Sequence, residues 1–475
     1  MRILIWFRKD LRLDDHTALS EAARDATGDV VPFYTSEPSL LGRPDLAATR
    51  VRFVLDSLHE LASRIAAAGS HLALAHGDAA DTVLHAARAS NADAVYWNDE
   101  YEPALRTRDD AVEASLLAAG IAVRRFHDRL LVPPGEVLTG SGTAYTVYTP
   151  FRRACEKLPL SRPLPTVSRF AAHDLPRRAI ASLDRLGIPE PSSERWPGGA
   201  SAAEARLSAF LEDGSAGLSQ YATERDFPAV RAHARLSADL KFGTLGIRRV
   251  ADAAIEAARG APALAKHSEK FITELRWRDF YAHVMHHFPH CEHGAFRPEF
   301  DAIRWSGRDA WFDAWREGRT GYPIVDAGMR ELLATGFMHN RTRMVVASFL
   351  TKDLLIDWRR GERHFMQHLV DGDLASNNGG WQWAAGTGTD AAPYFRIFNP
   401  VLQSQRFDAE GDYVRRWVPE LAALPNRHLH APWRAPLLVL AEHGIKLGEH
   451  YPHPIVDHAE QREQALAMYG ELKGA

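Results

Sequence analysis

The first 130 residues alternate between short β-rich segments and helical patterns, and this alternation limits the fold more than any other feature. Strands are expected at residues 2–7, 30–34, 71–76, 93–98 and 122–126. Between the second and third of these, apolar residues recur at helical spacing from Val51 to Ile65, and Gly69 ends the pattern. Strands that alternate with helices form a parallel sheet covered by helices, so residues 1–130 are predicted to be a doubly wound, Rossmann-like α/β domain.

The glycine-rich turn that binds dinucleotide phosphates is missing after the first strand. The segment FRKDLRLDD, residues 7–15, contains no glycine, so this domain is not expected to hold a dinucleotide in that way. Seven prolines from Pro159 to Pro197 indicate an irregular connector. After residue 200 the pattern is helical almost throughout. We therefore predict an interdomain linker at residues 131–200 and a helical domain at residues 201–475.

The composition excludes several classes of protein. The chain has 475 residues, a formal net charge of −4 and two cysteines, Cys155 and Cys291. Two cysteines provide no disulfide framework, zinc ribbon or iron–sulfur ligand set. The N-terminus becomes charged after seven residues and no segment approaches the ~20 apolar residues of a membrane helix, so we expect a soluble, cytoplasmic protein. The net charge gives no chain-wide signature of nucleic-acid binding but permits a local basic surface.

The segment DGDLASNNGGWQW, residues 371–383, combines carboxylates, carboxamides, glycines and tryptophans. It does not fit a calcium loop, because Ala375, Ser376 and Gln382 stand where a ligand, a glycine and a glutamate are required. We interpret it as a helix C-terminus and loop, with a backbone relaxed by Gly379 and Gly380. Its polar groups suit hydrogen bonding to a flat heterocycle, and the alternative is that they only cap and turn the chain.

Two further segments carry polar residues suited to binding. Glu274, Trp277 and Arg278 fall at i, i+3 and i+4, so they share one helix face that suits a planar ligand. Arg341 and Arg343 follow another helix and offer guanidinium groups suited to phosphate. The alternatives are an amphipathic helix with Trp277 in the core and a solvated charged face.

Three weaker signals remain. The turn at residues 243–246 enters a helix, and its N–H groups could take a phosphate. The segment HVMHHFPHCEH has five histidines, but their spacing fits no zinc set. His364 and His368 lack the glutamate of a metalloprotease helix. We therefore expect no metal, and we find no Ser/His/Asp or Cys/His arrangement for nucleophilic catalysis.

Together and in this order, these segments resemble the photolyase/cryptochrome family, specifically a microbial class I photolyase for cyclobutane pyrimidine dimers. The resemblance extends from WFRKDLRLDDHTAL near the start to YPHPIVDH at residues 451–458. It is densest in TGYPIVDAGMRELLATGFMHNRTRM, ASFLTKDLLIDWRRGE and DGDLASNNGGWQWAAGTGTDAAPYFRIFNP. The resemblance implies FAD in the helical domain, bound in a U shape, so the expected heterocycle is the isoalloxazine ring.

The resemblance also implies which residues surround the cofactor. Asp371 and Asp373 flank the flavin, Asp371 pairs with Arg343, and Asn377 lies against N5. The full implied set is Tyr221, Phe242, Gly243, Thr244, Leu245, Gly246, Phe271, Arg278, Arg343, Asp371, Gly372, Asp373 and Asn377.

The phosphate part of the cofactor is expected at Tyr221 and at the turn of residues 242–246. Phe242 and Gly246 stand where family members often carry hydroxyl side chains. Thr244 and backbone donors must therefore provide more of the phosphate contact.

The implied reaction is driven by light. Excited, fully reduced flavin donates an electron to a dimer flipped out of the duplex, the cyclobutane ring splits and the electron returns; photolyases are known base-flipping enzymes. Glu274 hydrogen-bonds the thymine edge, Trp277 and Trp383 form apolar walls, and Asn340 and Met344 complete the pocket. The implied DNA contacts are Arg225, Glu274, Trp277, Asn340, Arg341, Arg396 and Gln403, a local basic rim whose binding should weaken with salt.

Two accessory features are implied as well. Trp305, Trp358 and Trp381 match the family's tryptophan chain, which reduces the flavin by light, and core packing is the alternative for each. The α/β domain would carry an antenna chromophore near the domain cleft. The segments AATRVRF and YWNDEYEP, with Phe33, Arg50 and Asp99, resemble binders of 8-hydroxy-deazaflavin more than binders of methenyltetrahydrofolate.

Three alternative functions are each opposed by a feature of the sequence. A cryptochrome photoreceptor is opposed by the complete lesion-pocket set and by the short segment after the helical domain. A (6-4) photolyase would carry histidine where Asn340 stands. A non-photochemical flavin oxidoreductase would need a nicotinamide site, and the dinucleotide fingerprint is missing. The expected partner is DNA containing cyclobutane pyrimidine dimers, bound by a monomer without an obligate protein partner.

Overall fold

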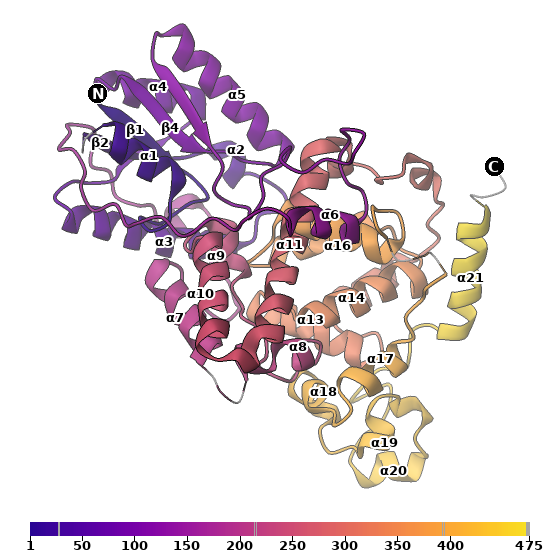
Figure 1. Ribbon diagram of the computed structural model, residues 1–475. Helices are drawn as coiled ribbons and strands as arrows, with labels where there is room; N and C mark the ends of the chain where they lie inside the picture. The colour runs from indigo at the N-terminus through magenta and orange to yellow at the C-terminus, as the bar shows by residue number, and fades with distance from the viewer. Residues whose placement is uncertain (27–28, 213, 215, 392, 394, 472–475) are drawn as a thin grey trace.

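The computed structural model describes residues 1–26, 29–212, 214, 216–391, 393 and 395–471. An α/β domain packs beside a larger helical domain, and the linker runs along both (Figure 1). The predicted fold class is therefore confirmed. Within the described ranges, no helix combines the length and the apolar character that crossing a membrane requires.

Five parallel strands form the sheet of the α/β domain in the order β3, β2, β1, β4, β5. They are β1 (Ile3–Phe7), β2 (Val30–Ser36), β3 (Ala73–His76), β4 (Ala94–Asn98) and β5 (Ala122–Phe126). Each strand predicted from the sequence is present. Ile3 of β1 pairs with Val30 on one side and with Ala94 on the other, so the strand order reverses at β1 as in a doubly wound sheet.

Helices cover both faces of this sheet (Figure 1). They are α1 (Thr17–Asp25), α3 (Ala48–Ala67), α4 (Ala79–Ala89) and α5 (Pro103–Ala118), while the short α2 (Pro38–Leu41) follows β2 and buries none of its residues. Successive side chains of a strand point to opposite faces, and β1 follows this rule. Ile5 packs with residues of α1 and α3, whereas Trp6 packs with residues of α4 and α5. Because both faces are buried, β1 is apolar throughout.

The linker contributes α6 (Tyr148–Cys155), and helices dominate the rest of the chain. The helices that build the site are α8 (Tyr221–Glu224), α9 (Ser237–Phe242), α10 (Ile247–Gly260), α11 (Ala265–His287), α14 (Asn340–Ser348), α15 (Trp358–His368), α16 (Leu374–Ala385) and α17 (Pro400–Phe407). The others are α7 (Ala200–Glu212), α12 (Asp309–Arg316), α13 (Pro323–Thr335), α18 (Asp412–Trp417), α19 (Asn426–Leu429), α20 (Leu437–Glu442) and α21 (His458–Glu471).

The buried segment that joins α14 to α15 is not a continuous helix. A π-helical turn, Phe349–Asp353, follows α14, and Leu355 then adopts a positive φ of 52°. Asp357 caps the new helix by accepting a hydrogen bond from the Arg359 N–H (3.0 Å). The sequence conceals this break, because no glycine or proline marks it and residues 349–356 are all buried, the polar Thr351, Lys352 and Asp353 included. The break lets α15 begin in a new direction at Trp358.

Candidate functional site

Residues 371–383 begin a helix instead of ending one. Asp373 is the N-cap of α16 and accepts a hydrogen bond from the Ser376 N–H (3.0 Å). Gly379 lies inside the helix, where a Cβ would approach the ring of Tyr281 on α11 to 2.1 Å. The prediction of a helix C-terminus and loop is therefore wrong. The glycine permits α11 and α16 to pack closely, and it does not mark a turn.

Asp371 lies immediately before this helix and is buried. Arg343 on α14 donates to both of its carboxylate oxygens at 3.0 and 3.1 Å, which is the predicted pairing. Ser237 at the start of α9 also donates to Asp371 (2.6 Å). Arg50 on α3 donates to the Gly372 carbonyl (3.1 Å), so the α/β domain helps to hold this segment.

Asp373 is surrounded by cations from both domains. Lys241 and Arg129 lie 3.8 Å from its carboxylate, and Arg278 lies close behind them. Burial alone would raise the pKa of Asp373, but Lys241, Arg129 and Arg278 together hold it well below its ordinary value. Burial in turn lowers the pKa of Lys241 to about 8. The structure thus holds an ionised Asp373 at neutral pH.

One side of α16 offers space for a flat ligand. Asn377, Gly380 and Trp383 follow one another at intervals of three residues, so they lie on neighbouring parts of the helix surface. A Cβ on Gly380 would meet no atom within 4 Å. Asn377 donates through Nδ2 to the Glu362 carbonyl (3.1 Å), which fixes its carboxamide. An open helix face bordered by a carboxamide and an indole fits the edge and plane of an isoalloxazine ring.

The turn at residues 242–246, predicted to bind phosphate, faces the α/β domain instead. The Thr244 hydroxyl donates to Asp239 (2.9 Å). Asp15 covers the N-terminus of α10, where it accepts a hydrogen bond from the Arg249 N–H (3.3 Å). A Cβ on the last glycine of the turn would lie 2.0 Å from an Asp15 carboxylate oxygen. We therefore correct this prediction: a carboxylate occupies the place expected for phosphate, and the turn joins the two domains.

Tyr221 and Phe271, also predicted at the cofactor, are buried in an apolar cluster. Their rings meet edge to face with centroids 5.2 Å apart, and Phe210 packs against both. Burial, followed by the charge of Glu274, raises the pKa of Tyr221. Phe271 belongs to α11 and Tyr221 to α8, so this contact packs the two helices together.

The predicted helix face on α11 is present. Glu274, Trp277 and Arg278 are all partly exposed, whereas their neighbours Leu275 and Arg276 are buried. The Glu274 carboxylate pairs with Arg225 (3.2 Å), which follows α8, and with Lys270 (2.9 Å) on α11.

The predicted DNA-contact residues gather around α8, α11, α14 and α17. Arg341, in the first turn of α14, pairs with Asp226 (3.0 Å) and lies over the Phe407 ring of α17, 4.0 Å from its centroid. Gln403 lies one turn before Phe407 on α17, and Arg396 is exposed in the segment before that helix. Arg225 and Glu274 lie on the neighbouring side, next to Asp226.

Asn340 and Met344 occupy the same turn of α14. The Asn340 Nδ2 lies 3.8 Å from the Met344 sulfur, and Asn340 is exposed at the start of the helix. Arg225 pairs with Glu274 and lies next to Asp226, which pairs with Arg341, so the Glu274 face of α11 lies near the first turn of α14. Both helices pack against α16.

The three tryptophans of the predicted electron-transfer chain belong to one region of the core. Trp381 and Trp358 are buried, and Trp305 packs against the same cluster while remaining partly exposed. Trp381 meets Phe365 edge to face (4.9 Å). A Cβ on Gly361, one turn after Trp358, would lie 2.2 Å from the Trp381 ring, so α15 brings the two buried indoles near each other.

The three residues that suggested an antenna site are not brought together. Phe33 is buried in the core between the sheet and α4. Arg50 donates to backbone carbonyls of the helical domain, at Gly372 and Met366. Asp99 pairs with Arg125 on β5 (2.6 Å).

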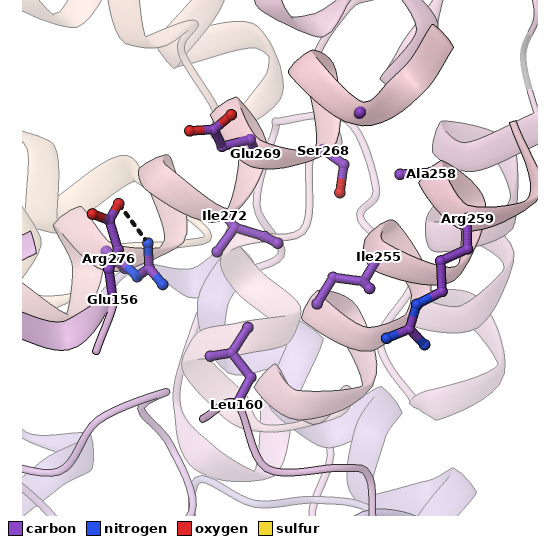
Figure 2. A pocket seen from close by; sticks show the side chains of 10 residues that line it. Glu156, Leu160, Ile255, Ala258, Arg259, Ser268, Glu269, Ile272 and Arg276 are labelled. Carbon is purple, nitrogen blue, oxygen red and sulfur yellow. Dashed lines mark hydrogen bonds and ion pairs between the residues drawn. The ribbon is translucent and has the colours of Figure 1, made fainter. Parts of the chain in front are cut away.

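A groove of about 520 Å³ lies on the other side of α11, between α10 and the linker (Figure 2). Leu160, Ile255 and Ile272 line its middle, and the ion pair of Glu156 and Arg276 (3.1 Å) borders one end. None of the predicted site residues lines this groove. Its volume therefore does not identify the functional site.

Sequence reasoning missed Ser237, Lys241 and Glu362. Ser237 and Lys241 are spaced i, i+4 on α9, and this spacing could have indicated that they share one face of the helix. Glu362 lies on α15, where burial raises its pKa to about 7 and Asn378 donates to its carboxylate (3.0 Å). No local pattern reveals it, because its environment is formed by α16.

Two family models match most of the chain. A family described as the FAD binding domain of DNA photolyase matches residues 271–471, and one described as DNA photolyase matches residues 3–168. A deoxyribodipyrimidine photo-lyase of Synechococcus is 42% identical, over 100% of this chain and 97% of that protein.

Solved structures resemble the fold over nearly the whole chain. A bacterial class III photolyase from Agrobacterium tumefaciens has a TM-score of 0.91 at 41% identity, covering 100% of this chain and 98% of its own. A cryptochrome from Synechocystis has the same TM-score at 29% identity, covering 98% and 99%. The sequence is thus more similar to these photolyases than to this cryptochrome. The chain belongs to the DNA photolyase family and contains its FAD-binding domain.

Proposed function

We propose that this protein repairs cyclobutane pyrimidine dimers in DNA with light. The observation that carries the proposal is a set of ion pairs that links α11 to the start of α14. Arg225 pairs with Glu274 (3.2 Å) and lies 3.9 Å from Asp226, and Asp226 pairs with Arg341 (3.0 Å), the neighbour of Asn340. When bound, FAD in its reduced form absorbs the light and supplies the electron that opens the dimer. The reaction class of the family's curated relatives supports the same conclusion.

The cofactor would be held by the residues at the start of α16. Asp371, fixed by Arg343 and Ser237, provides a carboxylate for polar ring atoms, and the ionised Asp373 provides a second. Asn377 uses its Nδ2 for the Glu362 carbonyl, so its oxygen is turned to accept an N–H of the ring. The role of these three residues is to orient the flavin, and none of them needs to transfer a proton in the proposed reaction.

The flipped dimer would lie against α11 and α14. Glu274, fixed by two cations, accepts a hydrogen bond from the thymine edge. Trp277 and Trp383 provide aromatic surface, and base–aromatic stacking of about 1–3 kcal/mol per base offsets the loss of stacking in the duplex. Met344 adds an apolar, adaptable side chain that excludes water from the base edge.

The DNA backbone would be bound by the rim of that pocket. Arg225, Arg341, Arg396 and Gln403 present donors to phosphates on both sides of the lesion. Arg225 and Arg341 are held at the rim by Glu274 and Asp226 before DNA arrives. The protein has a formal net charge of −4, so its attraction for DNA must come from this local basic rim. We therefore expect its affinity for DNA to fall as the salt concentration rises.

Accessory features form part of the same proposal. Trp381, Trp358 and Trp305 conduct an electron inward from the surface, which reduces oxidised flavin but is not needed for repair. The α/β domain carries an antenna chromophore, with 8-hydroxy-deazaflavin favoured over a folate by the segments AATRVRF and YWNDEYEP. The family resemblance also supports a monomer that works in the cytoplasm.

Binding in darkness tests the proposed substrate. A duplex with one thymine dimer and the same undamaged duplex are compared by their dissociation constants at two salt concentrations. We expect the dimer to be preferred by about 10³-fold or more, as for other specific DNA-binding proteins. Equal affinity for the two duplexes would contradict the proposal and favour a cryptochrome-type photoreceptor.

A further inference from the structure

Tyr148 from the linker is stacked on Trp277. Their ring centroids are 3.6 Å apart and their planes differ by 11°, so the phenol covers one face of the indole. Tyr148 is buried, whereas Trp277 remains partly exposed. The linker segment therefore forms part of the layer behind the proposed lesion pocket.

Polar contacts hold Tyr148 in this position. Its hydroxyl donates to the Thr273 carbonyl on α11 (2.5 Å), and its backbone N–H donates to the Asp390 carboxylate (3.1 Å). The Thr389 hydroxyl donates to the Thr146 carbonyl two residues earlier. Tyr148 is thus tied both to the helix that carries Trp277 and to the segment that follows α16.

An indole at a pocket surface has freedom that binding must remove. Fixing an interfacial side chain costs part of the binding free energy, and a receptor that is already ordered avoids this cost. Phe280 lies nearly perpendicular to the Trp277 ring (5.9 Å) and Tyr281 is tilted by 34° against it (5.8 Å), so neither ring is parallel to the indole. Tyr148 is the neighbour that lies parallel to the indole, and a parallel contact fixes the ring plane.

We propose that Tyr148 is a positioning residue that fixes the plane of Trp277, so that the opposite indole face is ready to receive the flipped pyrimidine dimer. The inference rests on the proposed function, because it concerns the same pocket. Tyr148 itself touches neither the lesion nor the cofactor in this account. Its contribution is to discrimination between damaged and undamaged DNA.

Three substitutions test the inference. Tyr148→Leu removes the ring, and Tyr148→Phe retains the ring without the hydroxyl. Tyr148→Met fills the space without a ring and replaces the leucine variant if that variant does not accumulate as folded protein. Phe151→Leu is the matched control, because Phe151 is buried on the same helix and contacts Phe280 and His283 instead of Trp277. Each variant is measured for FAD absorbance, thermal midpoint, and affinity for duplexes with and without one dimer.

We expect Tyr148→Leu or Tyr148→Met to bind the dimer duplex about fivefold more weakly, the size of one aromatic pair. Affinity for undamaged DNA, FAD content and repair per bound dimer stay within about twofold. Tyr148→Phe restores wild-type affinity, and Phe151→Leu lowers the thermal midpoint without changing dimer affinity.

Two results would overturn the inference. One is wild-type dimer affinity in the variants that lack the ring. The other is an equal loss in Phe151→Leu, which would assign the effect to general stability. If wild-type protein itself fails to distinguish the two duplexes, the proposed function fails and this inference with it. If wild-type protein discriminates and repairs while Tyr148→Leu is unchanged, only the inference fails.

Discussion

Replacing Glu274 with alanine separates lesion recognition from general DNA binding. The carboxylate pairs with Arg225 (3.2 Å) and Lys270 (2.9 Å) and lies on α11, whereas Asp371 and Asp373 precede α16. Its removal should therefore leave FAD bound. It takes away the acceptor proposed for the thymine edge and at the same time frees two cations at the rim.

Loss of the acceptor should weaken binding to damaged DNA, whereas release of the two cations should strengthen binding to undamaged DNA. A hydrogen bond to a charged group contributes about 1.5–3 kcal/mol, so affinity for the dimer should fall by about 10- to 150-fold. Lys270, released from the carboxylate, can make up to one additional phosphate contact. The salt dependence of binding to undamaged DNA then becomes steeper, by about 0.9 in the slope of log K against log salt. Preference for the dimer falls while non-specific binding holds or rises.

The assay is a salt titration of binding to damaged and undamaged duplexes, with repair of the bound dimer measured in light. Glu269→Ala provides the control, because Glu269 is exposed on the same helix but lines the groove on its other side. That variant removes one negative charge and should leave dimer preference unchanged. Unchanged repair by Glu274→Ala, or a shallower salt slope, would refute the reasoning.

Three further predictions follow from the buried groups. Trp381→Phe should block photoreduction of oxidised flavin but leave repair by chemically reduced enzyme intact; photoreduction at the wild-type rate would remove Trp381 from the chain. Arg343→Met leaves Asp371 buried without its cation, at a cost of about 2 kcal/mol of stability, a value reduced because the Arg343 side chain is 26% exposed. Adding Asp371→Asn to the Arg343→Met protein should recover part of the lost thermal midpoint and FAD retention. If the losses of the two single variants simply add in the double variant, the ion pair is contradicted. Asp279 accepts a hydrogen bond from the Val132 N–H, but its burial raises its pKa to about 7. The native state therefore keeps a proton on Asp279 at pH values where the unfolded chain, with the ordinary pKa of 3.8, has released it. Stability from this group is therefore lost as pH rises from about 4 to about 7, and Asp279→Asn should flatten that part of the dependence of the thermal midpoint on pH; an unchanged profile would contradict it.

The architecture was accessible from sequence because its signals are local. Strand and helix alternation, with buried strands such as β1, reports a parallel sheet without knowledge of distant contacts. The start of α16 was misread because Gly379 suggested a turn, whereas it permits contact with Tyr281 on a helix about 100 residues earlier. The break after α14 was hidden for the opposite reason, since no glycine or proline marks it and the residues across it are all buried.

The site was accessible in part. The shared face of Glu274 and Trp277 follows from helical spacing, and the partner of Asp371 came from the family resemblance. The turn at residues 242–246 could not be placed, because its neighbour Asp15 belongs to the other domain. Ser237, Lys241 and Glu362 were missed because tertiary contacts, and not local patterns, give them their roles.

Repair of an oligonucleotide that carries a single thymine dimer tests the central claim most directly. Purified protein with chemically reduced FAD is mixed with the oligonucleotide and kept in blue light or in darkness, and the restored thymines are quantified. The account predicts restoration in light only, with enzyme turning over. Absence of restoration in light, by protein that retains its FAD, would contradict it, as would equal restoration in darkness.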